Sequence, residues 1–143
     1  MSVELPFAPV DSIIRRNADG LRVSAEAAEE LARRIQDRGA DVAAVAADQA
    51  RADGRKTLMA EDFDGNRVDD KDDLELPIAP VDRIARLDID DTYRVSMDAR
   101  IVLTGLLESF ADEVAAGAAK LARHAGRRTI KAEDVQMYLE LTD

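Results

Sequence analysis

The chain has 143 residues, 30 of them acidic and 20 basic, and a formal net charge of −10. Hydrophobic residues make up 46% of it but aromatic residues only 3%, so Ala, Leu, Val and Ile must build the core, which is typical of closely packed helices. The lack of cysteine excludes disulfides, thiol catalysis and zinc–thiolate sites, and no apolar run approaches the ~18 residues of a membrane span, so we expect a soluble helical protein.

The first half of the chain predicts a short helix, a long helix and a third that is barely one turn. The short helix begins after Leu5-Pro6 and ends at Asn17–Gly20. Ser24 is a natural N-cap for a helix from about Ala25 to Ala52. Positions with helical spacing form its predicted apolar stripe, namely Leu31, Ile35, Val42, Val45 and Ala46.

The second half repeats the first with one inserted residue near Thr92. Residues 5–63 align with residues 76–135, and 27 of the 59 paired columns are identical. The stripe of the second long helix is Leu103, Leu107, Phe110, Val114 and Leu121. Here the closing helix is complete, running amphipathically from Ala132 to Leu141.

A long helix with short helices at its ends has no compact interior, so each copy needs the other to bury its apolar stripe. We therefore predict one cooperative unit made of residues 1–66 and 76–143, with an acidic linker at 67–75.

The acidic charge is unevenly spread and of an unusual kind. Residues 1–63 carry −3, residues 64–75 carry −4 and residues 76–143 carry −3; twenty of the acids are Asp and sixteen of the bases are Arg. For an ordinary protein such a net charge argues against a polyanionic partner. We interpret it first as an adaptation to concentrated salt, in which Coulomb fields are screened within a few ångströms.

Three segments of the second copy resemble archaeal histones: Leu76–Pro80, Arg94–Ser96 and Leu121–Asp134. The whole chain resembles a histone doublet of the acidic type expected from a halophilic archaeon. The resemblance implies an all-α protein of two tandem histone folds, clasped in a handshake as an intrachain pseudo-dimer. It also implies that duplex DNA bends or wraps around the outside without base-specific contacts.

The same resemblance implies which residues bind DNA. Arg22 and Arg94 would enter the minor groove, where a guanidinium needs no base-specific pattern. The remaining implied phosphate contacts are Arg15, Arg83, Arg86, Lys56 with Thr57, and Arg128 with Thr129. Arg15 and Arg86 can equally be helical surface arginines paired with neighbouring acids. In the first copy Ser12 replaces Arg83 and Ala28 replaces Arg100, so that copy offers fewer cations.

Further implied roles are structural. Arg55 with Asp62, and Arg127 with Asp134, match the clamp that holds each loop to its closing helix. Leu121, His124 and Asp134 match the contact through which histone dimers associate. Gln49 and Ala52 stand at the first two of these positions in the first copy. We therefore expect two chains to associate through the second histone fold alone.

The sequence shows no motif of an enzyme, and a single histidine without cysteine offers no metal site. We expect no cofactor, no small-molecule substrate and no membrane partner. Two functions stay open: a DNA-binding chromatin protein located in the cytoplasm on the nucleoid, or a histone-fold interaction module or transcription regulator that touches DNA weakly. Binding to random duplex at molar KCl would separate them.

Overall fold

The computed structural model describes residues 2–63 and 70–142. The first copy contains α1 (Phe7–Ala18), β1 (Arg22–Val23), α2 (Ala25–Ala52), β2 (Thr57–Leu58) and the 3-10 turn η1 (Ala60–Asp62). After a second 3-10 turn, η2 (Lys71–Asp73), come α3 (Ile78–Ala85), β3 (Arg94–Val95), α4 (Met97–His124), β4 (Thr129–Ile130) and α5 (Ala132–Thr142). The predicted short–long–short order is therefore present in both copies.

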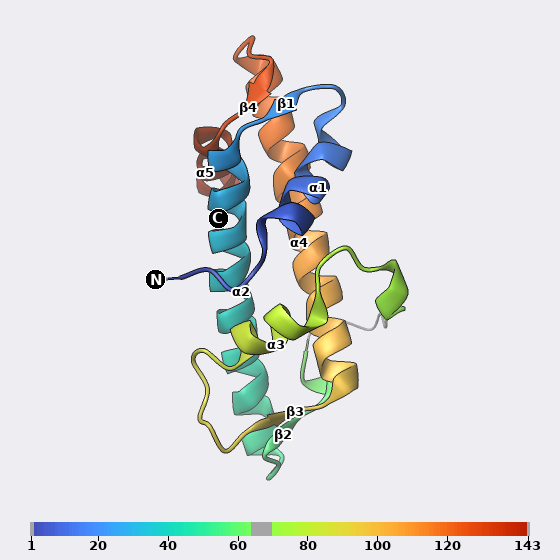
Figure 1. The fold of residues 1–143 in the computed structure, drawn as a ribbon. Coiled ribbons are helices and arrows are strands. Elements are labelled where there is room, and N and C mark those ends of the chain that lie inside the picture. Colours follow the sequence, from blue (N-terminus) through green and yellow to red (C-terminus); the bar gives the residue numbers. More distant parts are fainter. Residues whose placement is uncertain (1, 64–69, 143) are drawn as a thin grey trace.

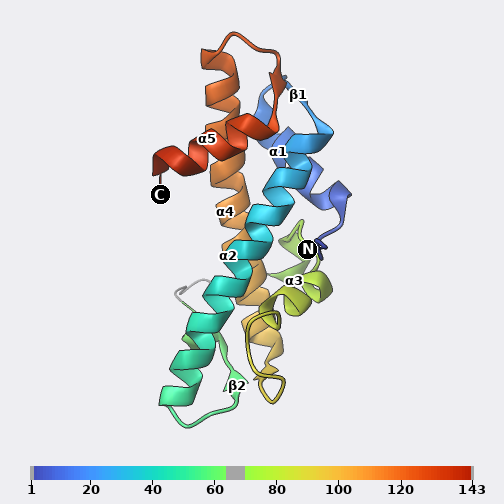
Figure 2. The same cartoon turned by 90° about the vertical axis from the view of Figure 1, so that its left-hand side faces the viewer.

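The two long helices cross near their centres (Figures 1 and 2). Each has 28 residues, and Ser24 and Ser96 cap them by accepting hydrogen bonds from Ala27 N and Ala99 N, both at 3.1 Å. Gly39 marks a tight contact of α2 with its neighbours. A Cβ at that position would lie 2.7 Å from Ile84 Cγ2 and 2.9 Å from Leu107 Cδ1.

Each copy's first helix packs mainly on the long helix of the other copy. α1 packs most extensively on α4, and α3 more on α2 than on α4. The largest fully buried aliphatic side chains accordingly come from both copies: Ile13, Ile14, Leu31, Ile35, Leu58, Leu76, Ile84, Leu103, Leu107 and Ile130. They belong to one continuous core.

Hydrogen bonds from long-helix side chains anchor the segments that precede the first helices. Glu4 N donates to Gln36 Oε1 at 2.7 Å. In the second copy Glu75 N and Leu76 N donate to Glu108 Oε1 at 2.7 and 3.0 Å. Gln36 and Glu108 are buried and occupy equivalent positions in the repeat. Both polar side chains thus have a structural role in the entry to each copy.

Two short parallel strand pairs join the copies at opposite ends of the molecule (Figure 1). β1 pairs with β4, and β2 pairs with β3. α1 and α3 lie between these two ends. Every strand of the described chain therefore pairs with a strand of the other copy.

The closing elements differ, as predicted. α5 packs on both α4 and α2, whereas η1 is a single turn. This difference makes one core assignment wrong: Val45 was expected in the apolar stripe of the first long helix, but it is 68% exposed. No closing helix covers that part of α2 in the described chain. Val45 instead lines an open concavity with Val42, Phe63 and charged neighbours.

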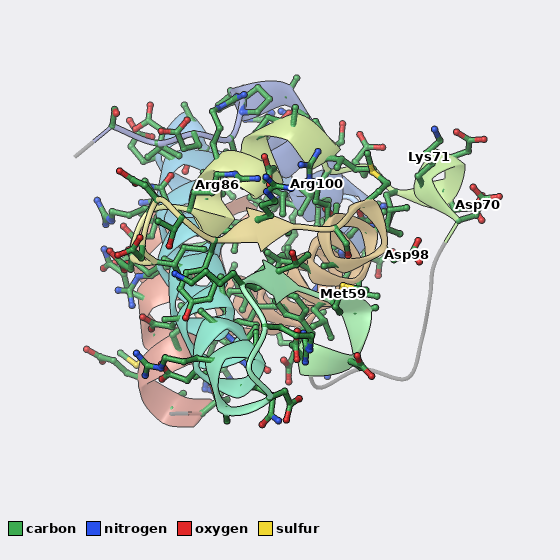
Figure 3. All side chains as sticks on the ribbon, turned by 90° about the horizontal axis from the view of Figure 1, so that it is seen from below. Met59, Asp70, Lys71, Arg86, Asp98 and Arg100 are labelled. Atoms are coloured by element: carbon green, nitrogen blue, oxygen red, sulfur yellow. The ribbon has the colours of Figure 1, made fainter. Side chains whose placement is uncertain are left out.

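The predicted linker is only partly described, since residues 67–69 lie outside the described ranges. Its described part includes η2, which stands away from the body of the molecule, as Asp70 and Lys71 show in Figure 3. Within the described residues, no helix is both long and apolar enough to cross a membrane.

Candidate nucleic-acid interface

The β1–β4 pair brings predicted DNA-binding residues of both copies together. Arg22 is in register with Thr129, and Arg22 N donates to Arg128 O at 2.8 Å. The Arg22 and Arg128 side chains are exposed and Thr129 is half-buried. Two cations and a hydroxyl from segments more than 100 residues apart thus share one end of the molecule.

The β2–β3 pair repeats this geometry at the opposite end. Arg94 is in register with Thr57, and Arg94 N donates to Lys56 O at 2.8 Å. Each loop turns into its strand through a glycine with positive φ, Gly54 at 75° and Gly126 at 73°, a conformation that L side chains disfavour. The two loops therefore present equivalent backbones with different side chains.

Between the two ends, the predicted cations of α1 and α3 are paired with carboxylates. Arg15 Nε lies 2.7 Å from Asp11 Oδ2, and Arg83 Nε lies 3.0 Å from Glu4 Oε1. Arg86 Nε lies 3.1 Å from Asp82 Oδ2. To bind one of these arginines, a phosphate must therefore displace its carboxylate or share the arginine with it. The free energy that each such contact contributes to DNA binding is lower as a result.

Asp82 holds a second cation from the long helix. Arg100 Nε lies 3.2 Å from Asp82 Oδ1, and Figure 3 shows Arg100 next to Arg86. The equivalent carboxylate of the first copy, Asp11, has only Ala28 at the position of Arg100. The centre of the face thus carries more cations on its α3 side, as the sequence predicted.

In both predicted clamps the arginine is hydrogen-bonded to the aspartate. Arg55 donates to both oxygens of Asp62 at 2.7 and 2.8 Å, and Met59 N donates to the same carboxylate at 2.7 Å. These hydrogen bonds, that from Arg55 above all, lower the pKa of Asp62. The buried carboxylate therefore stays ionised and holds the loop after Gly54 to η1.

The second clamp is equivalent in its contacts. Arg127 donates to both oxygens of Asp134, at 2.6 Å for Oδ2, and Lys131 N donates to Oδ2 at 2.8 Å. Burial raises the pKa of Asp134, but the hydrogen bonds from Arg127 and Lys131 outweigh it and the net shift is downward. Because both oxygens already accept hydrogen bonds, any contact that Asp134 makes with another chain would have to add to the clamp.

The predicted association residues lie at the end of the molecule that carries β1 and β4. His124 is exposed, Leu121 half-buried and Asp134 buried. They are close to the complete closing helix α5. Their counterparts Gln49 and Ala52 are exposed at the end that has only η1.

A family model described as "Histone-like transcription factor (CBF/NF-Y) and archaeal histone" matches the chain twice, over residues 3–64 and 74–139. The chain belongs to this family. The two matches follow the two copies, so the structure consists of two tandem histone folds clasped to one another.

Individual relatives agree with this assignment. The chain is 52% identical over 63 residues to an archaeal histone HAN1 subunit of Thermococcus zilligii, a match that covers 44% of this chain and 91% of that protein. The crystal structure of the histone from Methanopyrus kandleri is 27% identical with a TM-score of 0.67, and the alignment covers 94% of this chain and 92% of that one. A crystal structure of a Thermus thermophilus protein, 17% identical with a TM-score of 0.72 over 97% of both chains, shares the fold.

Some charged residues of the paired histone folds were missed in the sequence. Arg16 on α1 donates to Asp112 on α4 at 2.7 and 2.9 Å and to Glu108 at 3.0 Å. Arg123 donates to Ala18 O at 2.8 Å. These contacts cross between the copies, and no local spacing predicts them. Lys120 and Lys131 were also missed. The first copy has Asp48 and Met59 at these positions, so a comparison of the two copies could have identified them.

Among the described residues, no group of three or more His, Asp or Glu side chains is arranged to hold a metal ion. The concavity beside Val45 is lined mainly by a cation, carboxylates and aliphatic groups.

Proposed function

We propose that this protein is an acidic histone doublet that binds double-stranded DNA on the chromosome and bends or wraps it without reading base edges. The observation that carries the proposal is the pairing of strands from different copies at both ends of the molecule. Each pair places an arginine beside a second cation and a hydroxyl, Arg22 with Arg128 and Thr129, and Arg94 with Lys56 and Thr57.

The chemistry of these two ends suits a DNA backbone. A guanidinium fits the narrow, negative minor groove, while a hydroxyl and an ammonium or guanidinium bind phosphate oxygens. Arg15, Arg83 and Arg86 would bind the phosphates between the two ends. The Thermococcus zilligii relative is described as an archaeal histone subunit, and this likeness supports the same role for this chain.

The structure also offers support for the second candidate, a histone-fold interaction module with weak DNA binding. The central arginines are already paired with carboxylates, and the net charge is −10. Both features lower affinity for a polyanion. We favour DNA binding because the strand pairs keep their exposed cations in spite of this acidic background.

The deciding experiment measures binding to random-sequence duplex over a KCl series that extends to about 2 M, where long-range fields are screened. We expect measurable binding by the wild type. Arg22→Ala with Arg94→Ala should weaken it and reduce the slope of log K against log salt by at most about 2, at ~0.9 per lost contact. Arg33→Ala, which removes an exposed cation from the N-terminal third of α2, is the control and should change little. Failure of the wild type to bind duplex at any salt would favour the interaction module.

A further inference from the structure

We infer that the DNA interface is polarised: the β1–β4 end binds duplex more strongly than the β2–β3 end, where Asp90 and the other exposed acids of its loop repel a phosphate that approaches Lys56. This inference rests on the proposed DNA binding and adds that the two ends of the molecule bind duplex with different strength. It follows from comparing the charges at positions of the two copies that correspond in the repeat.

The two loops after the long helices differ in exposed charge. Lys120 in the last turns of α4 corresponds to Asp48 in α2. Lys131, the residue after β4, corresponds to Met59, which Figure 3 shows next to η1. All four side chains are exposed. The β1–β4 end thus has two cations at positions where the β2–β3 end has a carboxylate and a thioether.

The loops after the first helices differ in the same sense. The loop before β3 carries Asp88, Asp90 and Asp91, all exposed, and contains the inserted Thr92. The loop before β1 has only Asp19 among the matching positions, with Asn17 and Gly20 in place of the other two acids. The acidic loop lies at the β2–β3 end, because it leads directly into β3.

Asp90 is held in a fixed position within this loop. Its Oδ1 accepts hydrogen bonds from Thr92 N at 2.9 Å and from Thr92 Oγ1 at 2.8 Å. These hydrogen bonds, together with the positive charge of Lys56, lower the pKa of Asp90. The carboxylate therefore remains negative beside the cation that was predicted to bind a phosphate.

The surroundings of Lys56 offer little uncompensated positive charge. A concavity of about 390 Å³ is lined by Arg51, Arg55, Lys56, Asp90 and residues of both loops. Arg51 lies 2.9 Å from Asp48, and Arg55 is engaged by Asp53 and by the clamp with Asp62. Arg51 and Arg55 are thus already paired, and a phosphate that approaches Lys56 is repelled by Asp90 in the same concavity.

The cations of the β1–β4 end have fewer acidic residues in the neighbouring loop. The loop carboxylate Asp19 is 92% exposed and lies 3.6 Å from Arg123, which is not one of the proposed DNA contacts. Within the part of the chain that the structure describes, no carboxylate lies within 4.0 Å of the charged groups of Arg22, Arg128 or Lys131. The same is true of Arg94 and Lys56, so the two ends differ in the acids that surround the cations and not in ion pairs made by them.

This difference should persist in concentrated salt. Salt screens charges that are farther apart than the Debye length, ~3 Å at 1 M, so only charged groups very close to a bound phosphate still affect its binding. The acids nearest each contact therefore matter more in such a solvent than the net charge of the protein. DNA is then held most strongly at the β1–β4 end and least strongly at the β2–β3 loops.

The test compares two matched double variants on one short duplex: Arg22→Ala with Arg128→Ala, and Arg94→Ala with Lys56→Ala. Each removes one strand arginine and its neighbouring cation. We expect the first to weaken binding by about tenfold or more and the second by less than about threefold. Equal losses, or a larger loss from the second, would overturn the polarity.

A gain-of-binding variant tests the role of Asp90 directly. Asp90→Asn with Asp91→Asn keeps an oxygen that can accept the Thr92 hydrogen bonds, and it should strengthen binding several-fold and steepen the salt slope. Asp19→Asn in the other loop is the matched control and should change affinity less than about twofold. An unchanged affinity of the Asp90 variant would refute its blocking role. Thermal melts establish that each variant is folded, and a wild type that binds no duplex would refute the proposed function rather than the polarity alone.

Discussion

Gly117 on α4 lies directly beneath the ring of Tyr138 on α5. A Cβ at position 117 would come within 2.0 Å of Tyr138 Cδ1 and 2.7 Å of its Cγ, so no side chain fits there without moving the ring. The equivalent residue of the first copy is Val45. The complete closing helix therefore occurs in the copy whose long helix has a glycine at the contact.

Gly117→Val should displace Tyr138 and loosen α5. Overpacking of this kind costs about 1–3 kcal/mol of unfolding free energy. The matched control is Val45→Ala, an exposed position where we expect a change within about 0.5 kcal/mol. Urea unfolding followed by circular dichroism measures both, and equal effects would contradict the packing described for α5.

The sequence predicted this architecture well where local patterns control it. The predicted limits of the first long helix, Ala25 and Ala52, are those observed, because Ser24 caps its start and the loop glycine follows its end. Val45 was misassigned because helical spacing identifies a stripe but not what covers it. The strand pairs bring the predicted loop cations together. The pairing of Arg15, Arg83 and Arg86 with carboxylates depends on side-chain geometry, which the sequence pattern does not give. The contact of Arg16 with Asp112, and the concavity that Asp90 and Lys56 share, join the two copies, so no spacing within one copy predicts them.

The two histone folds should unfold as one cooperative unit. α1 packs mainly on α4, and both strand pairs join different copies, so an isolated fragment of residues 1–66 would expose the apolar faces of α1 and α2. We expect this fragment to be unfolded or aggregated, and we expect one transition for the whole chain by calorimetry and by circular dichroism. A monomeric, helical 1–66 fragment with its own cooperative melt would contradict this expectation.

Acid should destabilise the protein through the two clamps. The pKa values of Asp62 and Asp134 are lowered from 3.8 in the folded state. Their contribution to stability is therefore complete above the unfolded value and is lost as the pH falls through about 4 and below. Asp134→Asn should lower stability at neutral pH and flatten its dependence on pH in this range. Asp41→Asn, at an exposed carboxylate, is the control for urea unfolding measured across the same pH series.

Association should stop at two chains. One end of the molecule offers Leu121, His124 and a complete α5, whereas the other offers Gln49, Ala52 and a single turn. A two-fold contact made by one end closes on itself. Leu121→Asp should give folded single chains that cover about half the DNA length of the wild type, and Gln49→Asp should leave the assembly intact. Sedimentation with long duplex measures both, and assemblies that grow beyond two chains would show that the other end also associates.

Because the two histone folds belong to one chain, they can differ in sequence, which the subunits of a symmetric dimer cannot. In a dimer of identical subunits each substitution occurs twice, at both ends of the complex. Here Gly117 and Val45, or Lys120 and Asp48, are separate codons of one reading frame, although they occupy equivalent places in the repeat. A single gene thus specifies a heterodimer with fixed one-to-one stoichiometry and no need to select the right partner. Mutation can then specialise one end for assembly while the other end diverges.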